Sequence, residues 1–109
     1  MAKQLREYRM QFEKVAPGET ADTAELGLRS KLGGVPNWDQ GDETPTCPHC
    51  QTEMVFIGQI DSIEHDSNKN PHRVGCISSD QEYMMGDVGE IFVFFCFGCL
   101  HPAAVFQCG

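Results

Sequence analysis

The stretch Ile91-Phe92-Val93-Phe94-Phe95-Cys96-Phe97-Gly98-Cys99 decides the fold. Its first five residues are the most hydrophobic and most β-prone run of the chain, which indicates a strand. The run leads directly into a Cys-x-x-Cys pair, and Gly98 inside that pair suits a tight turn. The sequence therefore predicts a strand that ends at two thiols.

A second Cys-x-x-Cys pair, Cys47-Pro48-His49-Cys50, precedes the first pair by 45 intervening residues. It lies just before an apolar run that begins near Met54, whereas the later pair follows the strand that ends near Phe95. In an antiparallel pair of strands, the start of one strand lies beside the end of the other. The sequence therefore predicts that both cysteine pairs meet at one edge of a mainly β, small antiparallel sheet, as in a zinc ribbon.

Four thiolates in two Cys-x-x-Cys turns are typical of a structural zinc site. Four thiolates also close the coordination shell, so no position is left for a catalytic water, and we expect one Zn²⁺ that stabilises the fold. Such an ion contributes on the order of 10 kcal/mol or more, so its removal should unfold the domain. The predicted metal ligands are Cys47, Cys50, Cys96 and Cys99.

Alternatives to this site remain open at the level of sequence. The four thiols could be reduced core residues, a redox pair, or ligands of iron instead of zinc. His49 and His101 lie close enough in sequence to replace a thiolate. Cys108 follows the second pair by about six strand residues, on the order of 20 Å, and is a poor ligand. Cys76 has no partner at metal spacing, so we expect it to be a small buried hydrophobe.

The remaining pattern predicts further strands around a turn-rich segment. Residues 17–46 are rich in Gly, Pro, Asn and Asp, so little regular structure is expected there, and Trp38 should pack on the core. Residues 7–15 alternate as a strand, although Leu5, Tyr8, Phe12 and Val15 also fit a helical stripe. The predicted strands are residues 7–15, 54–61 (apolar at its start and covered on both faces), 73–77, 91–95 and 103–106.

Length and charge limit the function classes. A chain of 109 residues fits one domain, 1–109, with the metal-binding turns at 47–50 and 96–99. The formal net charge of −8 disfavours nucleic acid and anionic membranes as partners and favours a basic protein. No apolar segment follows the N-terminal basic residues and none approaches a membrane span, so we expect a cytoplasmic protein.

The alternative prediction for the function of this chain is an enzyme. Polar residues that could supply acid–base or nucleophilic chemistry gather between residues 65 and 87, where a small hydrolase could have its site. A solvated loop explains the same residues, and no nucleophile motif accompanies them. We therefore expect no catalytic residue and no enzyme activity. The residues concerned are His65, Asp66, His72, Ser78, Ser79, Asp80 and Asp87.

Four blocks of the sequence resemble known families. They are residues 31–38 (Lys-Leu-Gly-Gly-Val-Pro-Asn-Trp), residues 47–50 (Cys-Pro-x-Cys), residues 54–60 with Phe56 and Gln59, and residues 93–99 with the second cysteine pair. The pattern resembles the bacterial YwqG-like family of unknown function and the programmed cell death protein 2 family. One departure is that Gln51 and Leu100 follow the cysteine pairs, where zinc-binding turns often have Gly.

The resemblance implies a compact β fold and binding to another protein. Eukaryotic members of the second family chaperone a ribosomal protein, and YwqG-like domains also occur among suspected immunity proteins of bacterial toxin systems. No catalytic residue carries over to this chain. The sequence as a whole therefore predicts a zinc-binding protein-interaction module.

Overall fold

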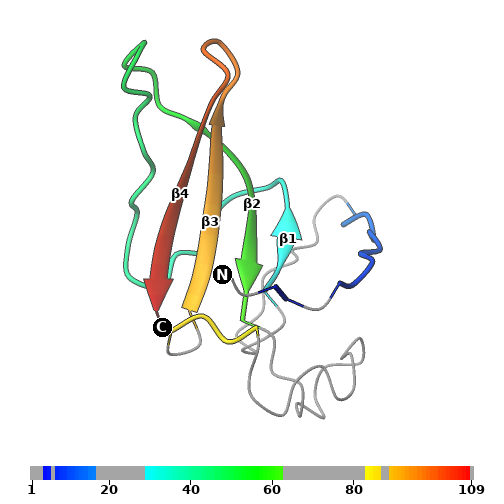
Figure 1. Cartoon of the computed structure of the whole chain (residues 1–109). Helices are drawn as coiled ribbons and strands as arrows, with labels where there is room; N and C mark the ends of the chain where they lie inside the picture. The colour runs from blue at the N-terminus through cyan, green and yellow to red at the C-terminus, as the bar shows by residue number, and fades with distance from the viewer. Residues whose placement is uncertain (1–3, 6, 17–28, 63–82, 87–88, 109) are drawn as a thin grey trace.

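The computed structural model describes residues 4–5, 7–16, 29–62, 83–86 and 89–108. These residues form one four-stranded antiparallel sheet and no helix, which confirms the predicted mainly β fold (Figure 1). The strands lie side by side in chain order. They are β1 (Lys31–Leu32), β2 (Val55–Asp61), β3 (Gly89–Cys96) and β4 (His101–Cys108).

The register brings the two ends that carry cysteines together. Val55 at the start of β2 pairs with Phe95 near the end of β3, as the antiparallel interpretation predicts. A register shift between Phe56 and Gly58 places one extra residue in β2, a β-bulge. β3 and β4 form a hairpin in which Cys96 pairs with His101.

One face of the sheet, here called the inner face, carries the core. Phe92 and Phe94 of β3 are fully buried there, and Trp38 lies against both rings at centroid distances of 4.5 and 5.8 Å. Trp38 belongs to residues 37–46, here called the strap, which run past the sheet from its lower end to the end with the cysteines (Figure 1). The prediction that Trp38 packs is confirmed, because the strap lays its ring over the central strand.

The opposite face, here called the outer face, is apolar and open. The cross-strand pairs of β2, β3 and β4 place aliphatic and aromatic side chains in register on it. The prediction that β2 is covered on both faces was wrong, because Val55 and Ile60 are each 50% exposed. The outer face consists of Leu32, Val55, Gly58, Ile60, Ile91, Val93, Phe95, Pro102, Ala104 and Phe106.

Residues 7–16 do not form the predicted strand. Met10 and Phe12 are 75% and 72% exposed, so the alternation in this segment does not face a core. Instead, the short strand β1 pairs with β2, inside the region where little regular structure was expected. The predicted strand at 73–77 lies outside the described residues, and the single-domain assignment stays a prediction.

The predictions for the three remaining strands were close. β2 begins one residue after the predicted start, and β3 and β4 are longer at both ends than the predicted 91–95 and 103–106. Among the described residues, no helix is long and apolar enough to cross a membrane.

Candidate functional site

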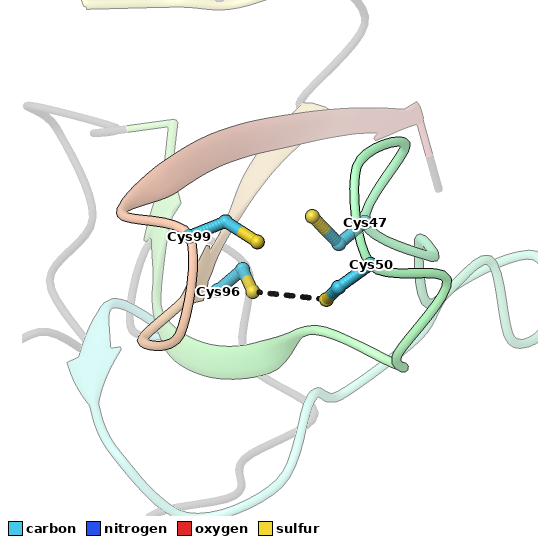
Figure 2. Close-up of side chains that lie close together, drawn as sticks. All are labelled: Cys47, Cys50, Cys96 and Cys99. Carbon is cyan, nitrogen blue, oxygen red and sulfur yellow. Dashed lines mark hydrogen bonds between the residues drawn. The ribbon is translucent and has the colours of Figure 1, made fainter.

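The four predicted ligands converge at one end of the sheet. The sulfur atoms of Cys47, Cys50, Cys96 and Cys99 all lie within 4.8 Å of one another. They point inward from two facing turns, one at the end of the strap and one at the tip of the β3–β4 hairpin (Figure 2). Two thiols are buried in the core and two are exposed, so the cluster lies at the border between core and solvent.

The spacing of the sulfur atoms fits a tetrahedral ion. Metal–sulfur bonds of about 2.3 Å place neighbouring sulfurs about 3.8 Å apart in an ideal tetrahedron. The Sγ atoms of Cys50 and Cys96 are 3.6 Å apart, close to that edge length (Figure 2). The cluster can therefore accept one ion with little movement, and zinc and iron fit this geometry equally well.

Each cysteine turn continues through a residue in the left-handed conformation. Gln51 has φ 61° and Leu100 has φ 56°, and each directly follows the second cysteine of its pair. This conformation reverses the chain, so the amide of Gln51 donates to the carbonyl of Cys47 at 2.9 Å. The departure from Gly at these two positions therefore leaves the turn intact but strained.

Hydrogen bonds around the cluster prepare one thiol to ionise. The hydroxyl of Thr52 and then its backbone N–H donate to Cys50 and lower the pKa of this thiol to about 6. The hydrogen bond from Cys99 to Cys50 contributes most to raising the pKa of Cys99 to about 12. Without a cation, adjacent thiolates repel one another, so full ionisation of the cluster requires a bound ion.

The other candidate ligands lie outside the four-sulfur cluster. The rings of His49 and His101 contact each other edge to face at a centroid distance of 5.1 Å beside the turns. Cys108 pairs with Gly89 at the opposite end of the hairpin, as expected for a residue that is no ligand. Cys76 lies outside the described residues.

Relieving the left-handed strain should stabilise the protein. Leu100 is 72% exposed, so its side chain contributes little packing. Because a non-Gly residue in this conformation costs about 1–2 kcal/mol and Gly loses part of that gain through its unfolded-state entropy, Leu100→Gly should raise the free energy of unfolding by roughly 0.5–1 kcal/mol. Urea unfolding of the metal-loaded protein measures this change. Leu100→Ala is the matched control, and equal stability of the two variants would contradict the explanation.

The opposite end of the inner face holds a buried ion network that the sequence analysis missed. The guanidinium of Arg29 contacts Asp39, Asp61 and Glu90 at 2.7, 3.2 and 2.8 Å. The side chains of Asp61 and Glu90 are fully buried. Three carboxyl groups around one cation leave an excess of negative charge, which a bound proton can offset.

Two glutamines extend this network into the strap. The Gln107 amide oxygen accepts hydrogen bonds from the backbone N–H groups of Asp39 and Gln40 at 2.9 and 3.0 Å. Gln59 accepts from the backbone N–H of Asn37 at 3.0 Å and donates to Glu90 at 3.0 Å. The strap is therefore held by polar contacts at one end and by the cysteine turn at the other.

One sequence signal could have found part of this network. Within β3, Glu90 has the same two-residue phase as Phe92 and Phe94, and that phase points to the core. A carboxyl group at a position that faces the core requires a hydrogen-bonding or cationic partner. The partner, Arg29, comes from a distant segment at no characteristic spacing, so the sequence did not identify it.

Because of the Arg29 network, we expect the free energy of unfolding to fall as pH rises. Burial and then a hydrogen bond with Asp39 raise the pKa of Glu90 from 4.5 to about 8. A raised pKa means that the folded state holds the proton more tightly. The contribution of protonated Glu90 to the free energy of unfolding is therefore complete below about pH 4.5 and is lost as pH rises through about 8. Between these values the free energy of unfolding should fall by at most about 1.4 kcal/mol per pH unit.

Denaturant unfolding of the metal-loaded protein from about pH 6 to about pH 9 tests this prediction. Glu90→Gln replaces the protonated carboxyl by a neutral group of similar shape, so its stability should depend less on pH. Glu53→Gln, at an exposed position, is the matched control and should follow the unmodified protein. The same slope for Glu90→Gln and the unmodified protein would rule out a proton held at Glu90.

Comparison with known proteins gives one match. The uncharacterized protein YpfL of Salmonella typhimurium is 30% identical over 78 residues, which cover 72% of this chain. That stretch is 15% of the length of the YpfL protein. No family model and no solved structure matches the chain. The resemblance to the YwqG-like and programmed cell death protein 2 families therefore stays a prediction.

Proposed function

We propose that this chain is a protein-interaction module in which one structural zinc ion joins the strap to the β3–β4 hairpin. The observation that carries the proposal is the convergence of four sulfur atoms within 4.8 Å at the end of the sheet. Cys47 and Cys50 belong to one turn and Cys96 and Cys99 to the other, so the ion bridges two segments that the chain itself connects only through a long path. Four thiolates leave no open coordination position, which supports a structural role.

Zinc is proposed over iron because it needs no redox partner and is the usual ion of four-cysteine structural sites. Elemental analysis of the purified native protein tests this choice directly and should give one equivalent of zinc. An iron site would show visible charge-transfer absorption from thiolate to iron, whereas a zinc site is colourless. One equivalent of iron with that absorption would replace zinc in the proposal and leave the joining role intact.

Two features of the surface support protein binding. The outer face is an exposed apolar surface, which is the kind of feature that marks interaction sites. The net charge of −8 favours a basic protein as the hetero-partner. Long-range electrostatic attraction would bring this partner to the surface, and complementary shape would then hold it there. Acidic side chains are exposed on the strap at Asp42 and Glu43 and beside the first cysteine turn at Glu53.

A salt series tests the basic partner. Binding to a panel of purified, strongly basic proteins should weaken steeply as salt rises, because salt screens the attraction between exposed charges. The metal-depleted chain is the control, since it keeps the same sequence charge but loses the folded surface. Salt-independent binding, or equal binding by the metal-depleted chain, would contradict the proposal.

No reaction is assigned to this chain. The residues of the enzyme alternative, including His65, His72 and Asp87, lie outside the described residues. An RNA-binding ribbon is disfavoured by the acidic balance, and absence of RNA binding at low salt is the expected result. The proposed location in the cytoplasm follows from the reduced state of the thiols that metal binding requires.

A further inference from the structure

The outer face is built from three cross-strand rows without any charged side chain. In the first row Ile60, Ile91 and Phe106 pair across the strands. The second row is Gly58, Val93 and Ala104, and the third is Val55, Phe95 and Pro102. Sixteen acidic and eight basic residues occur elsewhere in the chain, so this uncharged face is distinct from the average surface.

Side chains of the described residues leave this face open to solvent. Val55, Ile60 and Phe106 are each 50% exposed. Leu32 extends the face at the β1 side, because a Cβ placed at Gly58 would lie 2.9 Å from its Cδ2 atom. At the hairpin tip, Phe97 is 63% exposed and contacts Phe95 edge to face.

The relief of the face suits packing against another sheet. Its middle row contains the small residues Gly58 and Ala104 beside Val93, whereas the flanking rows carry Phe95 and Phe106. The row with the smaller side chains therefore lies between two rows that each carry a phenyl ring. Two such faces can interdigitate at the usual separation of about 10 Å between stacked sheets.

We propose that the outer face binds the outer face of a second copy of this chain, giving a two-fold dimer of stacked sheets. A protein with a net charge of −8 repels its own copies. The repulsion between two copies is therefore smallest when they meet through a surface that carries no charge. The same surface has no charge to attract a basic partner. The inference rests on the interaction role proposed above and assigns the exposed acidic residues, rather than this face, to a hetero-partner.

The size of the face sets the strength of the dimer. The three long strands have seven or eight residues. At about 3.3 Å per residue and about 4.8 Å between strands, they present roughly 23 by 14 Å of flat area. This area is well below the roughly 800 Å² per partner of a standard interface, so we expect a weak, reversible dimer.

Sedimentation velocity of the full, metal-loaded chain tests the dimer from low-micromolar to near-millimolar concentration. The mass should rise toward that of two copies, and the association should strengthen as salt rises, because salt screens the repulsion between acidic copies. Binding of a basic partner should weaken under the same change. The two salt responses therefore separate failure of the dimer from failure of the basic partner.

Ala104→Glu is the decisive variant, because Ala104 is exposed on the edge strand and lies in the middle row. The carboxylate stays solvated in the monomer, but in the dimer it would be buried against an apolar sheet. We expect the dissociation constant to rise at least about tenfold. Met10→Glu adds the same charge at a residue that is 75% exposed and outside the sheet, and it should dimerise like the unmodified chain.

Each other outcome overturns the proposal. A chain that stays monomeric at every concentration would mean that this face is covered by another part of the chain or is left bare. An Ala104→Glu variant that dimerises as well as Met10→Glu would place the contact on another surface. Loss of binding to a basic protein in Ala104→Glu, without any effect on self-association, would assign the face to that partner. Circular dichroism and metal content confirm that each variant is folded.

Discussion

Cys47→Ser should remove the metal and unfold the sheet. Cys47 is fully buried and supplies both a ligand atom of the cluster and part of the core. Because structural zinc contributes on the order of 10 kcal/mol or more, loss of the site exceeds or matches the 5–15 kcal/mol net stability usual for a domain. Elemental analysis and far-ultraviolet circular dichroism should show loss of zinc and of β signal, as should treatment of the unmodified protein with a strong chelator.

Cys108→Ser provides the matched control for this result. Cys108 also lies in the described part of the chain and is partly buried, but it pairs with Gly89, far from the cluster. This variant should keep one equivalent of metal and its β signal. The metal would have no role in stability if the chelated protein kept its sheet, and the four thiols would then serve packing or redox chemistry.

The second large effect is expected at Arg29. Arg29→Met removes the cation that contacts Asp39, Asp61 and Glu90, so buried carboxyl groups lose their compensating charge. Breaking a buried ion pair in this way typically costs 3–5 kcal/mol. Urea unfolding of the metal-loaded variant should show a loss of about that size, while the metal content stays at one equivalent, since the network and the cysteines lie at opposite ends of the strap.

Two further variants separate charge from packing. Lys31→Met removes a cation of similar length from the adjacent strand β1, where no ion pair is formed among the described residues, and should cost less than about 1 kcal/mol. The double variant Arg29→Met/Asp61→Asn should lose less than the sum of its single changes, because it removes one of the uncompensated carboxylates. Additive losses, or equal effects at Arg29 and Lys31, would show that the network is not held by charge.

The sheet was largely predictable because its signals are local. The run Ile91 to Phe95 and the two Cys-x-x-Cys pairs each indicate a structure within a few residues, and antiparallel pairing then determines which ends meet. The convergence of the four sulfurs follows from that pairing alone. The start of β2 was predicted within one residue for the same reason.

The features that the sequence did not predict depend on contacts between segments that are distant along the chain. Residues 7–16 alternate like a strand, but alternation yields a strand only where another backbone supplies hydrogen bonds, and the described part of the chain supplies none there. The edge of β2 is taken by Lys31–Leu32, a two-residue strand too short for any periodic signal. The Arg29 network joins distant segments in the same way, so pattern analysis could not assemble it.

The short hairpin connection between β3 and β4 has a consequence for how metal enters and leaves. Only residues 97–100 separate the two strands, so Cys96 and Cys99 come together as soon as this local hairpin forms. Hairpins of this kind form in microseconds, whereas the first cysteine turn must close a path of 45 residues to reach them. The ion should therefore bind first to the hairpin cysteines and then to Cys47 and Cys50. Exchange of the ion should begin with release of Cys47 and Cys50, while Cys96 and Cys99 still bind it.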